Sequence, residues 1–289
     1  MRIRNPFRRP WPKLPFPPGH FYSPIVDPET LDPARLWPDE CPEVAGIDFA
    51  DASHRTVLGE WFPRYIGLYD YAESASDPPE PTRFFSGNSQ FGWLDSRALF
   101  VLLHALAPAR VIEVGAGYSS LLMADVNARW RDGAIDITCI EPHPRDFLRR
   151  GVPGITRVIE RKVQQLEATT FAALDAGDIL FIDSSHVVKT GSDVNFLVFD
   201  VLPTLRRGVV IHFHDVFLPA EYPRHWAVDD NRSWNEQYLL RALLMHSDAF
   251  EVVFGSTNAC LRYPGLVARA LGPAADRATG GGSFWIRRR

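Results

Sequence analysis

Two short polar stretches of the sequence contain side chains that could carry out acid–base chemistry. Asp183 and His186 belong to D-S-S-H, and His212, His214 and Asp215 belong to H-F-H-D. A histidine titrates near neutral pH, so His186 could take a proton from a nucleophile, with Asp183 as its partner. Both stretches follow apolar runs typical of strands, and neighbouring parallel strands end at one crevice. The two stretches therefore predict a catalytic site.

Structural roles compete with catalytic ones for some of these residues. His212 falls within an apolar run, which favours a hydrogen-bonded core histidine over a functional one. Asp183 could merely cap the turn that follows it, but Ser192 and Asp193 already supply an N-cap for the next predicted helix. Asp183 is therefore interpreted as a functional residue.

A glycine turn precedes these stretches in the chain. The run R-V-I-E-V-G-A-G-Y-S-S spans residues 110–120, where Gly115 and Gly117 permit positive φ and close approach of a ligand. Ser120 holds the place of the third glycine in a dinucleotide fingerprint. Glu113, on the strand before the turn, would repel a pyrophosphate and attract a cation. The turn therefore favours a zwitterionic, phosphate-free nucleoside such as S-adenosylmethionine.

A second acidic residue, Glu141, ends the next predicted strand. A carboxylate in this place can accept hydrogen bonds from both ribose hydroxyls of a nucleoside. A solvated strand terminus is the alternative interpretation. Together with the turn and the order of the elements, Glu141 favours a nucleoside site.

The elements that must position these residues alternate along the chain. Strands are predicted at 110–114, 137–141, 157–161, 178–183, 208–215, 250–254 and 283–287, and helices at 96–107, 119–130, 145–150, 168–174, 194–202 and 235–246. Short apolar strands that alternate with helices predict a parallel sheet covered on both faces. The fold class is therefore α/β with a doubly wound, Rossmann-like sheet. The glycines at 280–282 predict a flexible turn before the last strand.

The N-terminal region differs from the rest in composition. Residues 1–24 alternate prolines with aromatic residues such as Phe7 and Trp11, which predicts an extended arm that serves as a surface strap, a lid or a dimer contact. A helix is predicted over 50–71, with Pro63 bending or splitting it. The proline cluster at 76–82 marks the boundary between an arm with a helical cap, 1–82, and a main domain, 83–289.

Composition excludes several classes of protein. The chain has 289 residues, 46% of them hydrophobic, and no run of eighteen apolar residues. Prolines interrupt the N-terminus where a signal peptide would need an apolar segment, so we expect a soluble, cytoplasmic protein. Cys41, Cys139 and Cys260 are widely spread and predict no disulfide or zinc site. The acidic body argues against nucleic acid as a partner, and the sequence offers no membrane segment.

The sequence resembles the class I methyltransferases that use S-adenosylmethionine, from about Ala107 to Arg288. E-V-G-A-G is similar to their first motif, C-I-E-P to their second and D-I-L-F-I-D-S-S-H to the motif on strand four. F-E-V-V-F and S-F-W-I-R are similar to their antiparallel sixth and seventh strands, although the connection at 255–282 is longer than usual. The resemblance implies seven strands, five parallel plus an antiparallel terminal pair. The cofactor residues it implies are Glu113, Gly115, Gly117, Tyr118, Ser119, Glu141, Gln164 and Asp183.

The polar stretches are also similar to those of metal-dependent O-methyltransferases. The resemblance implies that Asp183, His214 and Asp215 hold a divalent metal such as Mg or Mn, with His186 as the catalytic base beside Asp183. An oxygen ligand usually occupies the place of His214, and magnesium prefers oxygen. A histidine there shifts the preference toward manganese, iron or zinc. Whether a metal is bound stays open at this point.

The function expected is methyl transfer from S-adenosylmethionine to a hydroxyl of a small molecule. An N-methyltransferase, a nicotinamide-dependent oxidoreductase and a non-catalytic binding protein are the alternatives, and a homodimer stays open. Candidate acceptor contacts are Trp234, Asn235, Glu236 and Tyr238. The aromatic side chains of Phe84, Phe85, Phe91 and Trp93 could wall the methionine pocket, although core packing is an equal alternative.

Overall fold

A computed structural model describes residues 15–75 and 82–289 of the chain. Phe7 and Trp11 of the predicted arm, and residues 76–81 of the proline cluster, lie outside these residues. The division into an arm with a helical cap and a main domain stays a prediction.

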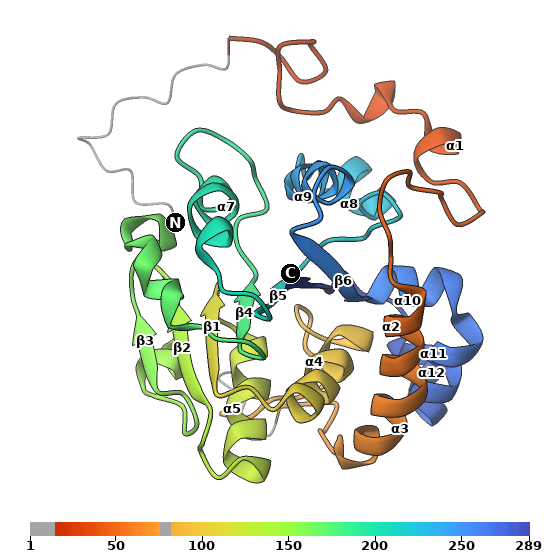
Figure 1. Cartoon of the computed structure of the whole chain (residues 1–289). Coiled ribbons are helices and arrows are strands. Elements are labelled where there is room, and N and C mark those ends of the chain that lie inside the picture. The colour runs from red at the N-terminus through yellow and green to blue at the C-terminus, as the bar shows by residue number, and fades with distance from the viewer. Residues whose placement is uncertain (1–14, 76–81) are drawn as a thin grey trace.

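The sheet has seven strands in the order β3-β2-β1-β4-β5-β7-β6 (Figure 1). The strands are β1 (Arg110–Val114), β2 (Asp136–Ile140), β3 (Arg157–Ile159), β4 (Ile179–Ile182), β5 (Val210–Phe213), β6 (Phe250–Gly255) and β7 (Phe284–Arg288). β1 to β5 are parallel, and β7 runs antiparallel to β5 and β6. The predicted α/β fold, with five parallel strands and an antiparallel terminal pair, is confirmed.

The strands form where short apolar runs are covered on both faces. Every residue of β4 and β5 is buried, as expected for central parallel strands. One core layer joins the sheet to α4 (Trp93–Leu106) and α5 (Tyr118–Trp130), and the other joins it to η6 (Phe196–Val201) and α9 (Glu236–Met245). The strand order reverses between β1 and β4, so the carboxyl ends of these strands flank a crevice.

The helix predicted over 50–71 is a succession of short segments. These are α2 (Asp51–Thr56), the π-helical η2 (Val57–Trp61), α3 (Phe62–Tyr65) and the 3-10 helix η3 (Ile66–Leu68). Pro63 has no backbone N–H to donate to Gly59, and its ring would clash with that carbonyl in a regular helix. A widened π turn precedes the proline. η2 contacts α4 and α11 (Pro264–Leu271), so this segment covers one side of the core.

The long connection from β6 to β7 is helical and ends in the glycine turn. It contains α10 (Ser256–Arg262), α11, η8 (Gly272–Ala274) and α12 (Ala275–Ala278), and both α10 and α12 contact α4. Gly281 has a φ of +129°, and a Cβ there would collide with the Asp95 carboxylate. A Cβ on Gly282 would lie 2.9 Å from Cα of Asp215. The glycines at this turn therefore let α4 and the end of β5 pack closely.

The described part of the N-terminal arm lies along the α8 and α9 side of the molecule (Figure 1). The Val26 amide donates to Ser233 Oγ at 3.1 Å, and Trp37 Nε1 donates to the Tyr222 carbonyl at 2.8 Å. A lid or dimer role for the arm stays a prediction.

The short helices not yet named are η1 (Pro28–Thr30), α1 (Pro33–Leu36), α6 (Asp146–Arg149), η4 (Val163–Gln165), η5 (Ala168–Ala173), α7 (Asp193–Asn195), η7 (Leu202–Thr204) and α8 (Arg224–Val228).

Within residues 15–75 and 82–289, no helix combines the length and the apolar character needed to cross a bilayer. The cytoplasmic location and the homodimer stay predictions.

Asp178 ties the start of β4 to the start of β1, and its loss should destabilise the fold. Its carboxylate accepts from the amides of Ala109, Arg110 and Asp175 at 2.8 to 3.0 Å while it is almost fully buried. Asp178→Ala would leave these amides without acceptors and should lower the free energy of unfolding by about 2–4 kcal/mol in urea titrations. Asp178→Asn keeps one acceptor oxygen and should cost less. The exposed Asp200→Ala control should stay within about 0.5 kcal/mol of wild type, and an equal loss in both alanine variants would contradict this role.

Candidate active site

The turn after β1 passes directly over the end of β4. Gly115 has a φ of +85°, and a Cβ there would collide with the carbonyl oxygen of Asp183. Gly117 has a φ of −162°, which any residue can adopt, and a Cβ there would meet nothing within 4 Å. Gly115 is thus required by the close approach of the two strand ends, whereas Gly117 leaves open space at the start of α5.

Glu113 lies behind this turn, fully buried. Its carboxylate accepts from Ser119 Oγ and Ser120 Oγ at 2.5 Å each, and Cys139 Sγ lies 3.2 Å away. Ser120 Oγ also accepts from the Gly117 amide at 2.9 Å, which explains a serine in the place of a third glycine. Glu113 therefore fixes the conformation of the turn, and its place in the cofactor site stays a prediction.

A polar hollow of about 420 Å³ opens at the carboxyl ends of β1, β2 and β4. The predicted cofactor residues that line it are Gly115, Glu141, Gln164 and Asp183. Glu141 accepts from the His143 amide at 2.8 Å, and Gln164 Nε2 donates to the Gly191 carbonyl at 3.3 Å. The other predicted cofactor residues lie at the turn. Ser119 is buried on Glu113, and the Tyr118 ring packs between Phe85 and the Arg145 guanidinium.

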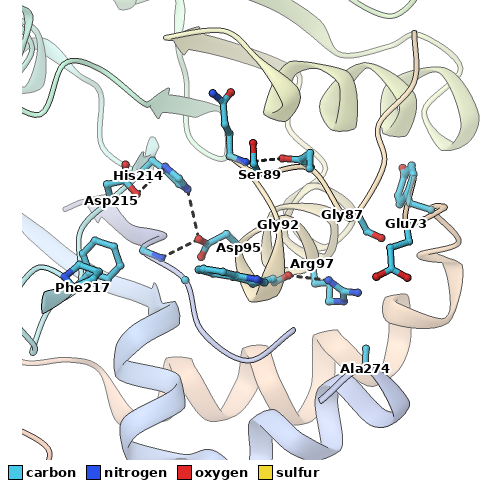
Figure 2. Close-up of a pocket in the computed structure, with 18 of the residues that line it drawn as sticks. Glu73, Gly87, Ser89, Gly92, Asp95, Arg97, His214, Asp215, Phe217 and Ala274 are labelled. Atoms are coloured by element: carbon cyan, nitrogen blue, oxygen red, sulfur yellow. Dashed lines mark hydrogen bonds and ion pairs between the residues drawn. The ribbon is translucent and has the colours of Figure 1, made fainter. Parts of the chain in front are cut away.

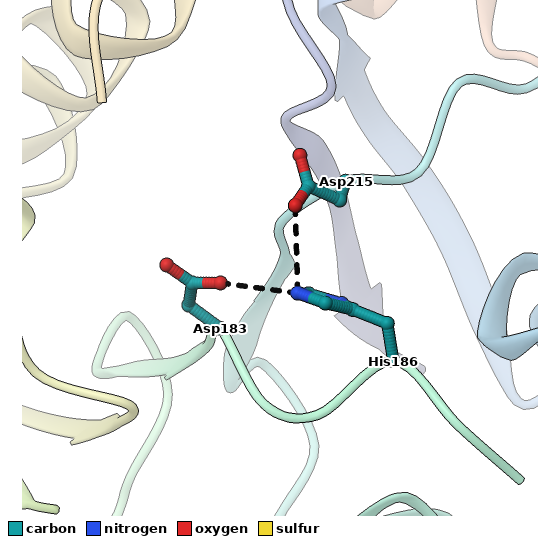
Figure 3. A group of neighbouring side chains, drawn as sticks. All are labelled: Asp183, His186 and Asp215. Atoms are coloured by element: carbon teal, nitrogen blue, oxygen red, sulfur yellow. Dashed lines mark ion pairs between the residues drawn. The ribbon is translucent and has the colours of Figure 1, made fainter. Parts of the chain in front are cut away.

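The two polar stretches meet in a ring of alternating acids and imidazoles. His186 Nε2 lies 3.4 Å from Asp183 Oδ1 and 3.4 Å from Asp215 Oδ2 (Figure 3). His214 Nδ1 lies 3.4 Å from Asp215 Oδ1 and 3.7 Å from Asp183 Oδ1. The sequence prediction that these four residues converge on one crevice agrees with this geometry.

A buried carboxylate lies next to one ring nitrogen of each imidazole in the ring. His186 Nδ1 donates to Glu236 Oε2 at 2.9 Å, and His214 Nε2 lies 3.5 Å from Asp95 Oδ2. Asp95 also accepts from the amides of Gly282 and Ser283 at 2.9 Å. Paired carboxylates of this kind fix the tautomer and orientation of a histidine. Sequence reasoning missed Asp95, which carries no motif, and treated Glu236 as an acceptor contact.

The backbone at the ring is strained. His186 and Asp215 have φ values of +59° and +56°, in the left-handed region that side chains with a Cβ rarely adopt. The His186 carbonyl accepts from the amides of Asn235 and Glu236 at 3.1 and 3.2 Å, which holds the strained turn against α9. Such strain is concentrated at functional sites.

Burial and charge move the pKa values of the ring in opposite directions. Burial would lower the pKa of His186, but Asp183 and Glu236 raise it to about 10. Burial would also lower the pKa of His214, but Asp215 and Asp183 hold it well above its ordinary value. Burial would raise the pKa of Asp183, but His214 and His186 hold it far below its ordinary range. The carboxylates of the ring therefore favour the protonated, positively charged form of both imidazoles.

His212 lies outside the ring. Burial holds its pKa well below the ordinary value, its ring stacks on Phe181 with the centroids 3.8 Å apart, and Nε2 lies 2.9 Å from Ser283 Oγ. This geometry agrees with the interpretation of His212 as a core histidine.

A larger cavity of about 880 Å³ opens on the other side of the ring. His214 and Asp215 lie at one end beside Asp95 and Phe217, and Glu73 lies toward the other end (Figure 2). Aromatic side chains that line it are Tyr69, Tyr71, Trp93, Phe217 and Trp226.

The other residues predicted to contact the acceptor make contacts within the protein. Asn235 Oδ1 accepts from the Val188 amide at 2.6 Å, and Tyr238 donates to Glu221 at 2.6 Å. The ring centroids of Trp234 and His186 lie 4.5 Å apart. Phe84 and Phe91 are buried in the core.

The sheet order, the glycine turn over β4 and the polar ends of β4 and β5 define a doubly wound α/β fold of the class I methyltransferase type. Residues 112–216 match a family described as "Methyltransferase domain". The chain is also 34% identical over 173 residues to an uncharacterized protein of Archaeoglobus fulgidus, a stretch that covers 55% of this chain and 74% of the relative. The chain belongs to the family of this relative and is a class I S-adenosylmethionine-dependent methyltransferase.

Two solved structures are similar to this chain at low TM-scores. A candidate O-methyltransferase from Klebsiella pneumoniae is 17% identical, with a TM-score of 0.37 over 83% of this chain and 90% of that chain. A cyclopropane-fatty-acyl-phospholipid synthase-like protein from Lactobacillus casei is 11% identical, with a TM-score of 0.33 over 81% and 98%. At these scores, the fold assignment depends on the sheet topology of the chain itself.

Glu113 should make stability depend on pH in a defined direction. Burial raises its pKa from 4.5 to about 7, against the hydrogen bonds from Ser119, Ser120 and Cys139 that lower it. The folded state therefore keeps a proton that the unfolded state has lost. The stabilisation from this carboxyl is complete below pH 4.5 and is lost as pH rises through about 7.

Glu113→Gln removes this titration. Between pH 5 and 7.5, the free energy of unfolding of the wild type should fall by about 2 kcal/mol relative to the variant. Urea titrations across this range would measure it. Parallel pH profiles for the two proteins would contradict the assignment.

Proposed function

We propose that the chain transfers a methyl group from S-adenosylmethionine to a hydroxyl of a small-molecule acceptor. The observation that carries this proposal is the place of the titratable ring between two cavities. Asp183 lines the polar hollow, whereas His214 and Asp215 line the larger cavity. A donor in the hollow and an acceptor in the cavity would meet at the ring, which is what an in-line displacement requires.

The hollow suits the nucleoside of the cofactor. Glu141 lies at the end of β2 with a carboxylate that can accept from ribose hydroxyls, and Gln164 lines the same hollow, where it would flank the adenine. The open space at Gly117 leaves room for the methionine end beside the turn, and the close packing at Gly115 holds this turn against the end of β4. Glu113 contributes by holding this turn.

Methyl transfer forms a bond between the acceptor oxygen and the methyl carbon and breaks the bond between that carbon and sulfur. The electron pair of the broken bond stays on sulfur, so S-adenosylhomocysteine leaves neutral, and the hydroxyl proton must go to a base. His214 is the histidine of the ring that lines the acceptor cavity, and Asp95 backs it. We assign the base role to His214 in place of His186. Its pKa falls toward neutral when a cation offsets the charge of Asp183 and Asp215.

The ring also offers a fit for a divalent metal. Asp183, His186 and Asp215 each supply one ligand atom, all within 4.8 Å of one another. Adjacent ligands of one ion lie about 3 Å apart when each bond is about 2.1 Å, close to the 3.4 Å separations in the ring. His186 therefore replaces His214 in the proposed ligand set, with Glu236 orienting it. Such a metal would lower the pKa of the acceptor hydroxyl, and the mixed donor set favours manganese, iron or zinc over magnesium.

Asp215 gives the test of the proposed activity. Asp215→Asn should lower methyl transfer at least about a hundredfold, because a charge beside the reacting hydroxyl is lost. Calorimetry should show S-adenosylhomocysteine binding within about threefold of wild type, since Asp215 does not line the hollow. The exposed Asp229→Asn is the matched control. A wild-type protein that does not bind S-adenosylhomocysteine, or an Asp215→Asn variant with full turnover, would overturn the proposal.

Substitution of each histidine in turn should separate the loss of metal binding from the loss of proton transfer. After growth with manganese, His186→Gln should lose metal by elemental analysis, whereas His214→Gln should keep metal and cofactor binding but lose turnover. Chelator should stop the wild-type reaction and added manganese should restore it. Turnover that survives chelation would argue against the metal and favour an amine acceptor, which needs a base only.

A further inference from the structure

The indole of Trp93 lies uncovered in the acceptor cavity. Trp93 lines this cavity with 59% of its surface exposed, which is unusual for so large an aromatic side chain. In the part of the chain that the structure describes, no aromatic ring or cation packs on it. Other aromatic side chains of the cavity are covered. The Arg232 guanidinium lies over the Trp226 ring at 4.3 Å, and Arg97 lies over Tyr69 at 4.7 Å.

The backbone holds Trp93 in a costly conformation. Its φ is +45°, in the left-handed region that is a true outlier for a bulky residue. The following residue and the Trp93 carbonyl fix this geometry, because the Leu94 amide donates to the Gly280 carbonyl at 3.3 Å and Arg97 donates to the Trp93 carbonyl at 3.0 Å. An exposed indole adds little burial to offset the strain. The arrangement makes sense when the free face of the indole contacts a ligand.

The glycine turn at 280–282 contacts both Trp93 and the residue at the reacting end of the cavity, Asp215. A Cβ on Gly280 would lie 3.8 Å from Cε3 of Trp93, and one on Gly282 would lie 2.9 Å from Cα of Asp215. Two residues of chain span at most about 7 Å. Trp93 and Asp215 therefore contact the same short turn and line the same cavity.

We propose that Trp93 is the platform on which a ring-bearing acceptor stacks, with the ring's hydroxyl directed toward Asp215. The acceptor class is a hydroxylated six-membered ring with a flat apolar face, either a phenol or a sugar, since both pack on an indole. This proposal rests on the proposed function for the transferred group. Trp93 itself determines specificity and takes no part in the proton transfer.

Binding of two simple probes tests the platform without requiring turnover. Catechol represents the aromatic acceptor and methyl α-D-glucopyranoside the sugar, each titrated by calorimetry in the presence of S-adenosylhomocysteine. Trp93→Ala should weaken the probe that binds the wild type at least about tenfold, and Trp93→Phe should stay within about threefold because it keeps a ring. Phe199→Ala removes an aromatic side chain of similar exposure, 57%, outside this cavity and should change nothing.

Stability separates a ligand platform from a structural residue. Trp93→Ala should melt no lower than the wild type, because it removes an exposed ring, and Trp93→Gly should melt higher, because it relieves the positive φ. S-adenosylhomocysteine binding should be unchanged in both variants. A fall in melting temperature together with loss of cofactor binding would overturn the proposal, as would a wild type that binds neither probe.

The outcomes also separate this proposal from the proposed function. Ring binding that depends on Trp93 in a protein that transfers no methyl group would support the platform and refute the activity. Methyl transfer to ring acceptors with the same KM in wild type and Trp93→Ala would support the activity and refute the platform.

Discussion

Two aspartates and two histidines hold one another in a half-enclosed ring of alternating charge, and the surrounding fold is arranged to support it. Asp183 and His186 come from the end of β4, and His214 and Asp215 come from the end of β5, the adjacent parallel strand. Charges removed from water must be paired, so each member of the ring depends on the others. The ring therefore couples the register of two central strands to the chemistry at their ends.

The same constraint explains the helices that flank the ring. Glu236 at the start of α9 and Asp95 in the first turn of α4 approach it from opposite faces of the sheet, and each orients one imidazole. Asp95 also holds the glycine turn before β7. One carboxylate thus joins α4, the end of β5 and the terminal antiparallel pair, which gives the long helical connection before β7 a direct structural link to the site.

The two cavities on either side of the ring differ in character. The hollow at β1, β2 and β4 is small, polar and framed by backbone turns, which suits a donor whose shape does not vary. The larger cavity is lined by aromatic side chains that include Trp93 of α4 and Trp226 of α8, together with the glycine turn at 280–282. In the proposed function, the hollow holds the donor and the larger cavity holds the acceptor, and the ring lies between them. The acceptor cavity could then vary in shape without a change in the cofactor site.

Local sequence was sufficient for the sheet, the glycine turn and the convergence of Asp183, His186, His214 and Asp215, because apolar runs and strand ends are read from neighbouring residues. Tertiary structure alone decided that Glu113 faces Ser119 and Ser120, since a strand buried on both faces does not reveal which face a carboxylate takes. It also supplied Glu236, 50 residues from His186, and Asp95, which lies far from His214 in sequence. Partners so distant carry no spacing signal, because their meeting depends on how helices pack across the sheet.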